Sequence, residues 1–171
     1  YACMFAALGV EVTLVEGRDR VLTFLDQEIS NALEKSMEKL GVTLSLSSLI
    51  DSVEHSEKGF QVSLSSGKSL VVENILAATG RTGATASLNL SALGLEAGSR
   101  GNLAVNEFYQ TAKSHVYAVG DVIGFPALAS TSMEQARIAM VHAFDLKYKT
   151  SLAQILPYGI YTIPECSMAG E

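Results

Sequence analysis

The sequence predicts an α/β fold in which a parallel sheet with crossover helices is followed by a small antiparallel meander. Residues 1–46 follow the order helix, strand, helix, strand, and this alternation is typical of parallel strands joined by helices. Residues 49–72 then show short strand-like runs separated by turn residues. Hydrophobic residues make up 48% of the 171 residues and charged residues 18%, which is the composition of a chain that forms a packed core.

The first helix and strand are predicted on either side of Gly9. Residues 1–8 are apolar and rich in helix formers, Gly9 is placed to end a helix, and residues 10–15 form a β-branched run. Asp26 is placed to cap a second helix, and a second strand is expected at residues 42–46. Apolar residues recur along the second helix at helical spacing, namely Ile29, Leu33, Met37 and Leu40.

Three short strands predict the meander. They cover residues 49–54, 60–64 and 69–72, and the segments 56–59 and 65–67 between them carry turn-forming Gly and Ser. Strands of this length with such short connections indicate antiparallel neighbours.

The second half of the chain is richer in loops. Residues 74–79 predict a buried strand that ends at Gly80, and residues 115–121 predict another apolar strand. Residues 131–134 have the form of a capping box and predict the start of a helix. That helix carries Met133, Ala136, Met140 and Phe144 at helical spacing. From residue 150 on, the sequence is largely uncharged and predicts irregular structure.

Charge and cysteine content exclude several classes of protein. The formal net charge of −6 argues against a nucleic-acid partner, because 12 Lys and Arg spread along the chain supply no basic face. No apolar run reaches the roughly 18 residues that span a bilayer, and no signal-peptide pattern is present. Cys3 and Cys166 are too far apart for a local redox or zinc motif, which fits a reducing compartment. We therefore expect a soluble cytoplasmic protein and, because Tyr1 stands in the middle of a helical pattern, a fragment.

Glu16 is the first candidate for a binding residue. It follows the predicted strand at residues 10–15, and an acidic residue at this place in a dinucleotide-binding βαβ unit accepts hydrogen bonds from ribose hydroxyls. The spacing fits if a glycine-rich loop lies just before Tyr1. Acidic residues after strands are more often solvated loop residues, so that alternative stays open beside the functional one.

Gly120 and Asp121 are the second candidate. Ligands of open α/β sheets bind at the carboxyl ends of strands, where a glycine permits close approach and a carboxylate can bind sugar or ribitol hydroxyls. The helix that follows would direct its N-terminal N–H groups toward the same place. Gly80 is a further position where a cofactor could approach. An ordinary loop aspartate and an ordinary turn glycine are the alternatives.

Two motifs together resemble the flavoprotein disulfide reductase superfamily, the class-I pyridine nucleotide-disulfide oxidoreductases. They are Ala-Thr-Gly-Arg-Thr at residues 78–82 and Thr-Ala-Lys-Ser-His-Val-Tyr-Ala-Val-Gly-Asp at residues 111–121. Residues 18–30, 120–130 and 159–165 look most like the transhydrogenase members of this family. The resemblance covers essentially the whole chain. It implies a Rossmann-like FAD- and NAD(P)-binding fold that is incomplete at both ends.

The resemblance also implies a division into domains. Residues 1–80 would form an NAD(P)-binding domain without its first strand and glycine loop. Residues 81–149 would form the C-terminal part of an FAD-binding domain, and residues 150–171 the start of a dimerisation domain. The parent protein would then be a homo-oligomer, at least a dimer.

Cofactor-binding residues follow from the same resemblance. Glu16 matches the acidic ligand of the nucleotide ribose, Ile50 a backbone contact on the adenine side, and Gly80 a glycine near the cofactor. Asp121 matches the aspartate that binds the flavin ribitol. Four residues match the start of the helix beneath the flavin ring, namely Ala127, Leu128, Ala129 and Ser130.

The implied reaction is hydride transfer from NADPH to FAD and then from the flavin to NAD. It requires no protein nucleophile, and no metal ligands are expected. Glu16 favours the free ribose hydroxyl of NAD, whereas Arg18 and Arg20 can pair with the 2′-phosphate of NADP. We therefore expect a pocket that accepts both nucleotides, with two solvated loop arginines as the alternative.

Two other functions remain open at this point. A disulfide reductase similar to dihydrolipoamide dehydrogenase or mercuric reductase would carry a redox-active Cys pair outside residues 1–171. An inactive nucleotide-binding remnant would show no flavin. Because the first strand of a doubly wound sheet is central, we expect the isolated 171 residues to be inactive, to bind FAD poorly and to aggregate.

Overall fold

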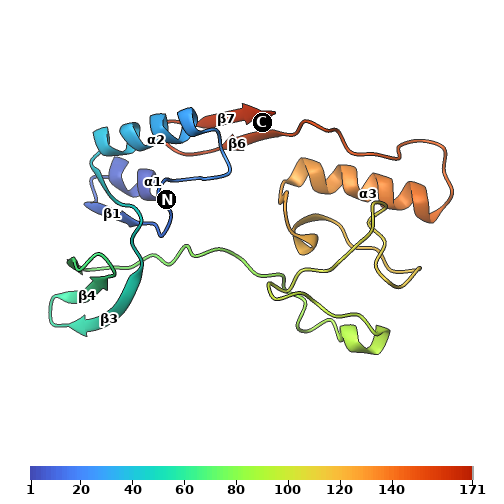
Figure 1. The fold of residues 1–171 in the computed structure, drawn as a ribbon, viewed down its shortest axis with the longest axis horizontal. Helices are drawn as coiled ribbons and strands as arrows, with labels where there is room; N and C mark the ends of the chain where they lie inside the picture. Colours follow the sequence, from blue (N-terminus) through green and yellow to red (C-terminus); the bar gives the residue numbers. More distant parts are fainter. Residues whose placement is uncertain (171) are drawn as a thin grey trace. The chain divides into compact units, whose positions relative to one another are not determined.

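The computed structural model describes residues 1–170, and the chain divides into two compact units (Figure 1). The first unit contains Tyr1–Ala77 together with the described residues from Pro157 on, and the second contains Ala78–Leu156. Within residues 1–170, no helix is both long enough and apolar enough to cross a membrane. The division at residues 80 and 149 into two nucleotide-binding domains and a third segment stays a prediction.

The first unit begins with the predicted order of helix, strand, helix and strand. These elements are α1 (Ala2–Ala7), β1 (Val12–Val15), α2 (Gln27–Lys39) and β2 (Val42–Ser45). β1 and β2 pair in parallel with Val12 opposite Val42, and α2 is the crossover helix between them. The predicted α/β fold with a parallel sheet is therefore confirmed.

Helix α2 begins where its cap predicts. The Asp26 carboxylate accepts a hydrogen bond from the N–H of Glu28 at 2.7 Å and so caps the first turn. Leu33 and Met37 lie one turn apart on the buried side of the helix. They pack with three further buried residues, Cys3, Val21 and Val42, into the core of the first unit.

The predicted antiparallel meander is also confirmed. Its strands are β3 (Ile50–Ser56), β4 (Gly59–Leu64) and β5 (Ser69–Val72), in this order in the sheet. The register places Val53 opposite Val62 and Val62 opposite Leu70, which gathers apolar side chains on one face. Glu54 and Gln61 pair on the opposite face. The meander therefore has one apolar side and one mainly polar side, where Val71 lies opposite Gln61.

The last described residues form a hairpin where the sequence predicts irregular structure. Its strands are β6 (Pro157–Ile160) and β7 (Cys166–Ala169), which pair antiparallel. Alternate residues are half-buried, and Cys166 packs on the core of the first unit. The ring of Tyr158 lies 6.2 Å from that of Phe24. Pro157 suggests irregular chain, but it occupies the first position of β6, where a missing N–H is tolerated.

Two strands predicted in the second half are absent from the described residues. Residues 74–79 are exposed and lie outside any helix or strand, because no described segment pairs with their backbone. Residues 115–121 make one isolated bridge, at Tyr117, and then enter the 3-10 helix η2 (Gly120–Ile123). The left-handed backbone of Gly120, with φ of 78°, ends the extended segment. Both strand predictions are wrong.

Helix α3 (Ala129–Ala143) begins before the predicted capping box. Its N-cap residue is Leu128, which supplies no side-chain cap. Thr131 is buried and Glu134 forms ion pairs with two basic side chains, so neither residue caps the helix. The buried side of α3 consists of Thr131, Gln135, Ile138, Ala139 and Val141. Three of the apolar residues predicted on this helix are exposed, namely Met133, Met140 and Phe144.

The loops before α3 contain the 3-10 helix η1 (Leu90–Leu93) and a close crossing of two backbones at Gly83 and Gly101. The N–H of Gly83 donates to the carbonyl of Arg100 at 2.8 Å. A Cβ at either glycine would overlap the carbonyl oxygen of the other. The two backbones approach this closely because neither residue has a side chain.

Replacing Gly83 with alanine is expected to lower the free energy of unfolding by about 1–3 kcal/mol, since the new Cβ must displace the backbone of Gly101. The control is Gly98→Ala, whose Cβ would lie 3.7 Å from the carbonyl oxygen of Asn102, an ordinary contact. Urea unfolding of both variants measures the difference. Equal stability of the two variants would contradict the proposed role of the crossing.

Candidate functional site

β1 and β2 end at the same edge of the parallel pair, and backbone hydrogen bonds continue beyond both ends. The N–H of Glu16 donates to the carbonyl of Ser45 at 3.0 Å, and the N–H of Ser48 donates to the carbonyl of Glu16 at 3.0 Å. The N–H of Ser47 donates to the carbonyl of Arg18 at 2.8 Å. The two loops are therefore fixed to each other at the edge where parallel sheets bind ligands.

The carboxylate of Glu16 is oriented by its own loop. Its Oε1 atom accepts a hydrogen bond from the N–H of Arg18 at 3.0 Å, in an exposed position. This bond gives the carboxylate a defined direction without removing it from solvent. Such a group is suited to accept hydrogen bonds from ligand hydroxyls.

An apolar surface lies beside Glu16. The Leu49 side chain covers Gly17 so closely that a Cβ on Gly17 would lie 2.7 Å from Leu49 Cδ2. Leu49 is 63% exposed and Ile50, the first residue of β3, is 48% exposed. The sequence predicts Ile50 as a site residue but not Leu49, whose contact with Gly17 depends on the folded loops. An oriented carboxylate beside exposed apolar side chains suits a ligand with sugar hydroxyls and a flat ring.

Arg18 and Arg20 have different surroundings. Arg18 is exposed, so its guanidinium is available to a ligand at this edge. Arg20 is half-buried, and its Nη2 atom donates to the carbonyl of Thr23 at 3.2 Å. Arg20 therefore stabilises its own loop, which leaves Arg18 as the better candidate for binding an anionic group.

The loop that carries both arginines is fixed to α2 by Glu34. Its Oε1 atom accepts a hydrogen bond from the N–H of Val21 at 2.9 Å. The hydroxyl of Ser30, also on α2, donates to the carbonyl of Leu22 at 3.4 Å. The sequence does not single out Glu34, because an acidic residue on an amphipathic helix usually faces solvent.

A second place with ligand-binding character lies where η2 meets the start of α3. Gly120 is buried, and its N–H donates to Gln135 Oε1 at 2.7 Å. A Cβ on Gly120 would lie 3.0 Å from Ser132 Oγ, so the glycine permits the close approach of η2 to α3. Asp121 follows in the first turn of η2 and is exposed. The structure thus brings the predicted Gly120 and Asp121 to the first turns of α3.

The first turn of α3 presents backbone N–H groups without a capping side chain, since its N-cap is Leu128. The next buried residue, Thr131, has an Oγ1 atom without a hydrogen-bond partner among the described residues. Free N–H groups together with the helix dipole favour negative charge in a ligand. The other residues predicted here are exposed, namely Ala127, Ala129 and Ser130.

Gly80 has the backbone of a turn glycine. Its φ is 111°, and nothing lies within 4 Å of the position that a Cβ would take. Its predicted contact with a cofactor stays a prediction, as do the ligand contacts of the other candidate residues.

Other groups in the described part of the chain offer less chemistry. Within residues 1–170, no group of three or more His, Cys, Asp or Glu side chains is arranged to hold a metal ion. Burial raises the pKa of the Tyr109 hydroxyl, which makes this group a weaker acid than an exposed tyrosine.

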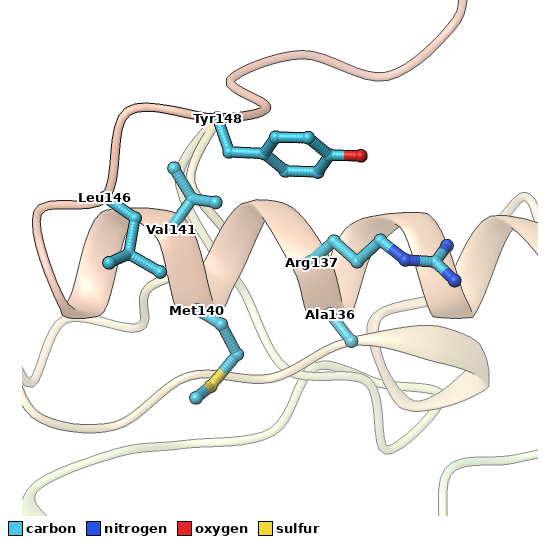
Figure 2. Close-up of a pocket in the computed structure, with 6 residues that line it drawn as sticks. All are labelled: Ala136, Arg137, Met140, Val141, Leu146 and Tyr148. Carbon is cyan, nitrogen blue, oxygen red and sulfur yellow. The ribbon is translucent and has the colours of Figure 1, made fainter.

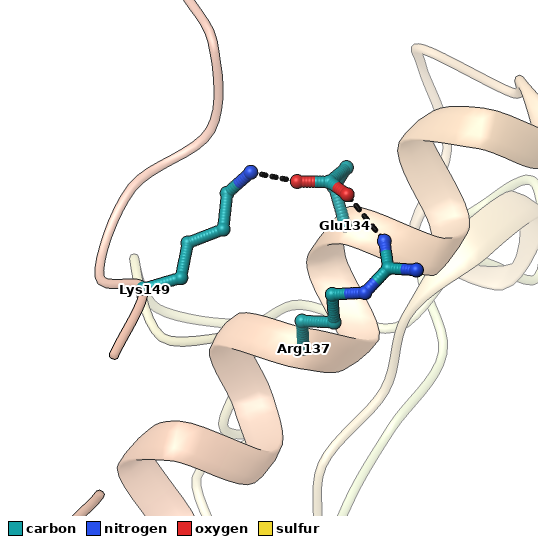
Figure 3. A network of polar contacts seen from close by, with 3 residues as sticks. All are labelled: Glu134, Arg137 and Lys149. Atoms are coloured by element: carbon teal, nitrogen blue, oxygen red, sulfur yellow. Dashed lines mark hydrogen bonds and ion pairs between the residues drawn. The ribbon is translucent and has the colours of Figure 1, made fainter. Parts of the chain in front are cut away.

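An open, largely apolar hollow of about 330 Å³ lies between the C-terminal half of α3 and the segment that follows it (Figure 2). It is lined by Ala136, Arg137, Met140, Val141, Leu146 and Tyr148. Beside it, Glu134 forms ion pairs with Arg137 on the same helix and with Lys149, and the second pair connects the segment after α3 to the helix (Figure 3). The hollow has one charged residue in its wall and no pair of acid and base. Binding chemistry is therefore better supported at the β1–β2 edge and at the start of α3.

Removing the acceptor at Glu34 is expected to make the loop that carries Arg18 and Arg20 more mobile. In Glu34→Ala, trypsin should cut after Arg18 and Arg20 about fivefold faster, because one hydrogen bond of about 1 kcal/mol that closes the loop is lost. Glu34→Gln keeps an acceptor oxygen and should behave like the unchanged protein. Glu38→Ala, an exposed position on the same helix, is the control. Cleavage that is equally fast in the Glu34→Ala and Glu38→Ala variants would contradict the proposed role of Glu34.

Comparison with known proteins agrees with this geometry. The family model described as "Pyridine nucleotide-disulphide oxidoreductase" matches residues 1–142. Soluble pyridine nucleotide transhydrogenases of Yersinia enterocolitica and Colwellia psychrerythraea are 48% and 47% identical to this chain over all 171 residues. The chain spans 37% of the length of each of these relatives.

Solved structures give the same result. LpdA (Rv3303c) from Mycobacterium tuberculosis is 30% identical with a TM-score of 0.87, and the match covers 97% of this chain and 36% of that one. The HOCl-induced flavoprotein disulfide reductase RclA from Escherichia coli is 28% identical with a TM-score of 0.89, over 99% of this chain and 39% of that one. With most of its length matched by the family model, the chain belongs to the pyridine nucleotide-disulphide oxidoreductase family.

Proposed function

We propose that the chain is part of a soluble transhydrogenase. This enzyme is an FAD-dependent oxidoreductase that transfers hydride from NADPH through the flavin to NAD. The observation that carries this proposal is the identity of 47–48% over all 171 residues with enzymes of that name. The parent protein is proposed to be a cytoplasmic homo-oligomer without a nucleic-acid or membrane partner. Residues 1–80 are proposed to bind NAD(P), residues 81–149 to belong to the FAD-binding domain, and residues 150–171 to open the dimerisation domain.

The residues where η2 meets α3 fit an isoalloxazine and its ribitol. Gly120 leaves room for close approach, Asp121 offers an exposed acceptor for hydroxyls, and the first turn of α3 offers N–H groups without a side-chain cap. Thr131 Oγ1 is a buried polar atom in the same turn without a partner among residues 1–170. These features support FAD as the cofactor.

When bound, the flavin supplies the chemistry of accepting and donating hydride. The protein's own residues would bind the flavin and orient it. Asp121 would accept hydrogen bonds from ribitol hydroxyls, and the first-turn N–H groups of Ala129 and Ser130 would stabilise negative charge without reorganising. No side chain is proposed as a catalytic nucleophile.

The β1–β2 edge is proposed as the nucleotide site. Glu16 would accept hydrogen bonds from the ribose hydroxyls, and Ile50 would contact the adenine side through its backbone. The exposed Leu49 side chain supports this assignment, because it provides an apolar surface for the base next to the carboxylate. Gly80 is proposed to lie near the cofactor.

The proposal is tested on the complete polypeptide that the gene encodes. It should purify with a yellow flavin chromophore and reduce a thio analogue of NAD at the expense of NADPH, without added disulfide. Asp121→Ala should lose the flavin, whereas Asp145→Ala, an exposed aspartate that pairs with Lys147, should keep it. A protein without any flavin spectrum would favour the inactive remnant and overturn the proposal.

Nucleotide preference should depend on Arg18 more than on Arg20. Arg18→Ala is expected to raise the KM for NADPH by about three- to tenfold, because one charge-assisted contact with the 2′-phosphate is lost. The KM for NADH should change by less than about twofold. Arg20→Ala should lower stability and affect both nucleotides alike, since its guanidinium binds the carbonyl of Thr23. Equal effects of Arg18→Ala on both nucleotides would contradict a role in binding the phosphate.

A disulfide reductase is the second candidate, because RclA, to which the chain is similar, is a flavoprotein disulfide reductase by name. The two cysteines of this chain, Cys3 and Cys166, are free thiols. Consumption of NADPH that depends on an added disulfide, together with thiol titration of the reduced protein, would favour this alternative.

A further inference from the structure

One side of α3 carries a row of residues that meets the segment before η2. Thr131, Gln135, Ile138 and His142 follow one another at helical spacing, and the first three are buried. Two of these residues form hydrogen bonds with the segment. Gln135 Oε1 accepts from the N–H of Gly120 at 2.7 Å, and His142 Nδ1 lies 2.8 Å from the hydroxyl of Tyr117.

The spacing of these two bonds fits their elements. Gln135 and His142 are seven residues apart on α3, which corresponds to about 10.5 Å along a helix. Tyr117 and Gly120 are three residues apart on a nearly extended segment, which corresponds to about 10 Å. The segment can therefore lie along the helix with a hydrogen bond at each end.

The bond at Gln135 is the one that water cannot replace. Gln135 is 2% exposed, Gly120 is buried, and the bond between them is buried in the interior of the second unit. The bond at Tyr117 is exposed by comparison. A buried N–H that loses its acceptor must find another or move toward solvent.

Movement at Gly120 would be passed directly to the next residue. Gly120 has a φ of 78°, and this left-handed turn directs the chain into η2, whose first turn contains Asp121. Ser132 Oγ lies where a Cβ of Gly120 would almost touch it, so the turn is closely fitted to α3. The bond between Gly120 and Gln135 thus helps to place the backbone from which the Asp121 side chain extends.

We propose that Gln135 is a positioning residue of the flavin site: through the N–H of Gly120 it fixes Asp121 relative to the start of α3. Gln135 itself touches no cofactor. The inference rests on the proposed function, because it takes Asp121 as the ligand of the flavin ribitol.

The test replaces Gln135 in the complete polypeptide and measures FAD binding to the apoprotein by quenching of flavin fluorescence. Gln135→Met keeps the length of the side chain and removes the acceptor, and is expected to weaken FAD binding by about tenfold and to change the visible flavin spectrum. Gln135→Glu keeps an acceptor oxygen and should restore binding to within about threefold. A Gln135→Met variant that binds FAD as tightly as the unchanged protein would overturn the proposal.

Ile138→Val is the matched control for stability. It removes one buried methylene from the same side of α3 without touching Gly120, and should lower thermal stability of the apoprotein while leaving the FAD dissociation constant unchanged. A Gln135→Met variant that behaves in the same way would show a purely structural role. Should Gln135→Met not fold, Gln135→Asn, with its acceptor one methylene short, must give weakened FAD binding. If the unchanged protein itself binds no FAD, the result overturns the proposed function, and the role of Gln135 falls with it.

Discussion

Backbone N–H groups need an acceptor wherever the chain leaves regular structure, and polar side chains supply it beside both candidate sites. A buried N–H without an acceptor costs about 1–3 kcal/mol, so these places strongly favour one arrangement. In the first unit Glu34 accepts from Val21, and in the second unit Gln135 accepts from Gly120. Each acceptor stands on a helix that packs into the interior of its unit. The position of each loop is therefore set by the packing of a helix.

This arrangement separates the residues that bind from the residues that position. Glu16 and Asp121 have the carboxylates suited to ligand hydroxyls, and both keep contact with solvent. Glu34 is half-buried and Gln135 is buried, and their hydrogen bonds to Val21 and Gly120 position the loops next to those carboxylates. A ligand can then displace water from the exposed carboxylate without breaking the bonds that hold its loop. Because the loop is held by a packed helix, little of the protein has to rearrange when a ligand binds, and this lowers the free-energy cost of binding.

Local patterns were sufficient for the elements of residues 1–72 but not for the hairpin of β6 and β7. Leu33 and Met37 recur at helical spacing after the cap at Asp26, and short turns join the strands of the meander, so neighbouring residues carry the information. Glu16 could be singled out because it directly follows a β-branched run. Residues 74–79 show the limit of such patterns. Their apolar sequence favours a strand, but a strand also needs a partner for its backbone, and no described segment provides one.

Helix α3 shows why the acceptors escaped prediction. Its exposed side contains Met140 and its buried side contains Thr131 and Gln135, so hydrophobicity alone indicates the wrong side. The acceptors lie 13 and 15 residues from their donors. Neither the helix period nor the strand period links residues that far apart. A polar residue at an otherwise apolar position of a helix is nonetheless a signal that the sequence contains. Because burial of an unpaired amide or carboxylate is costly, a Gln or Glu at a position that faces the interior implies a backbone group that requires it.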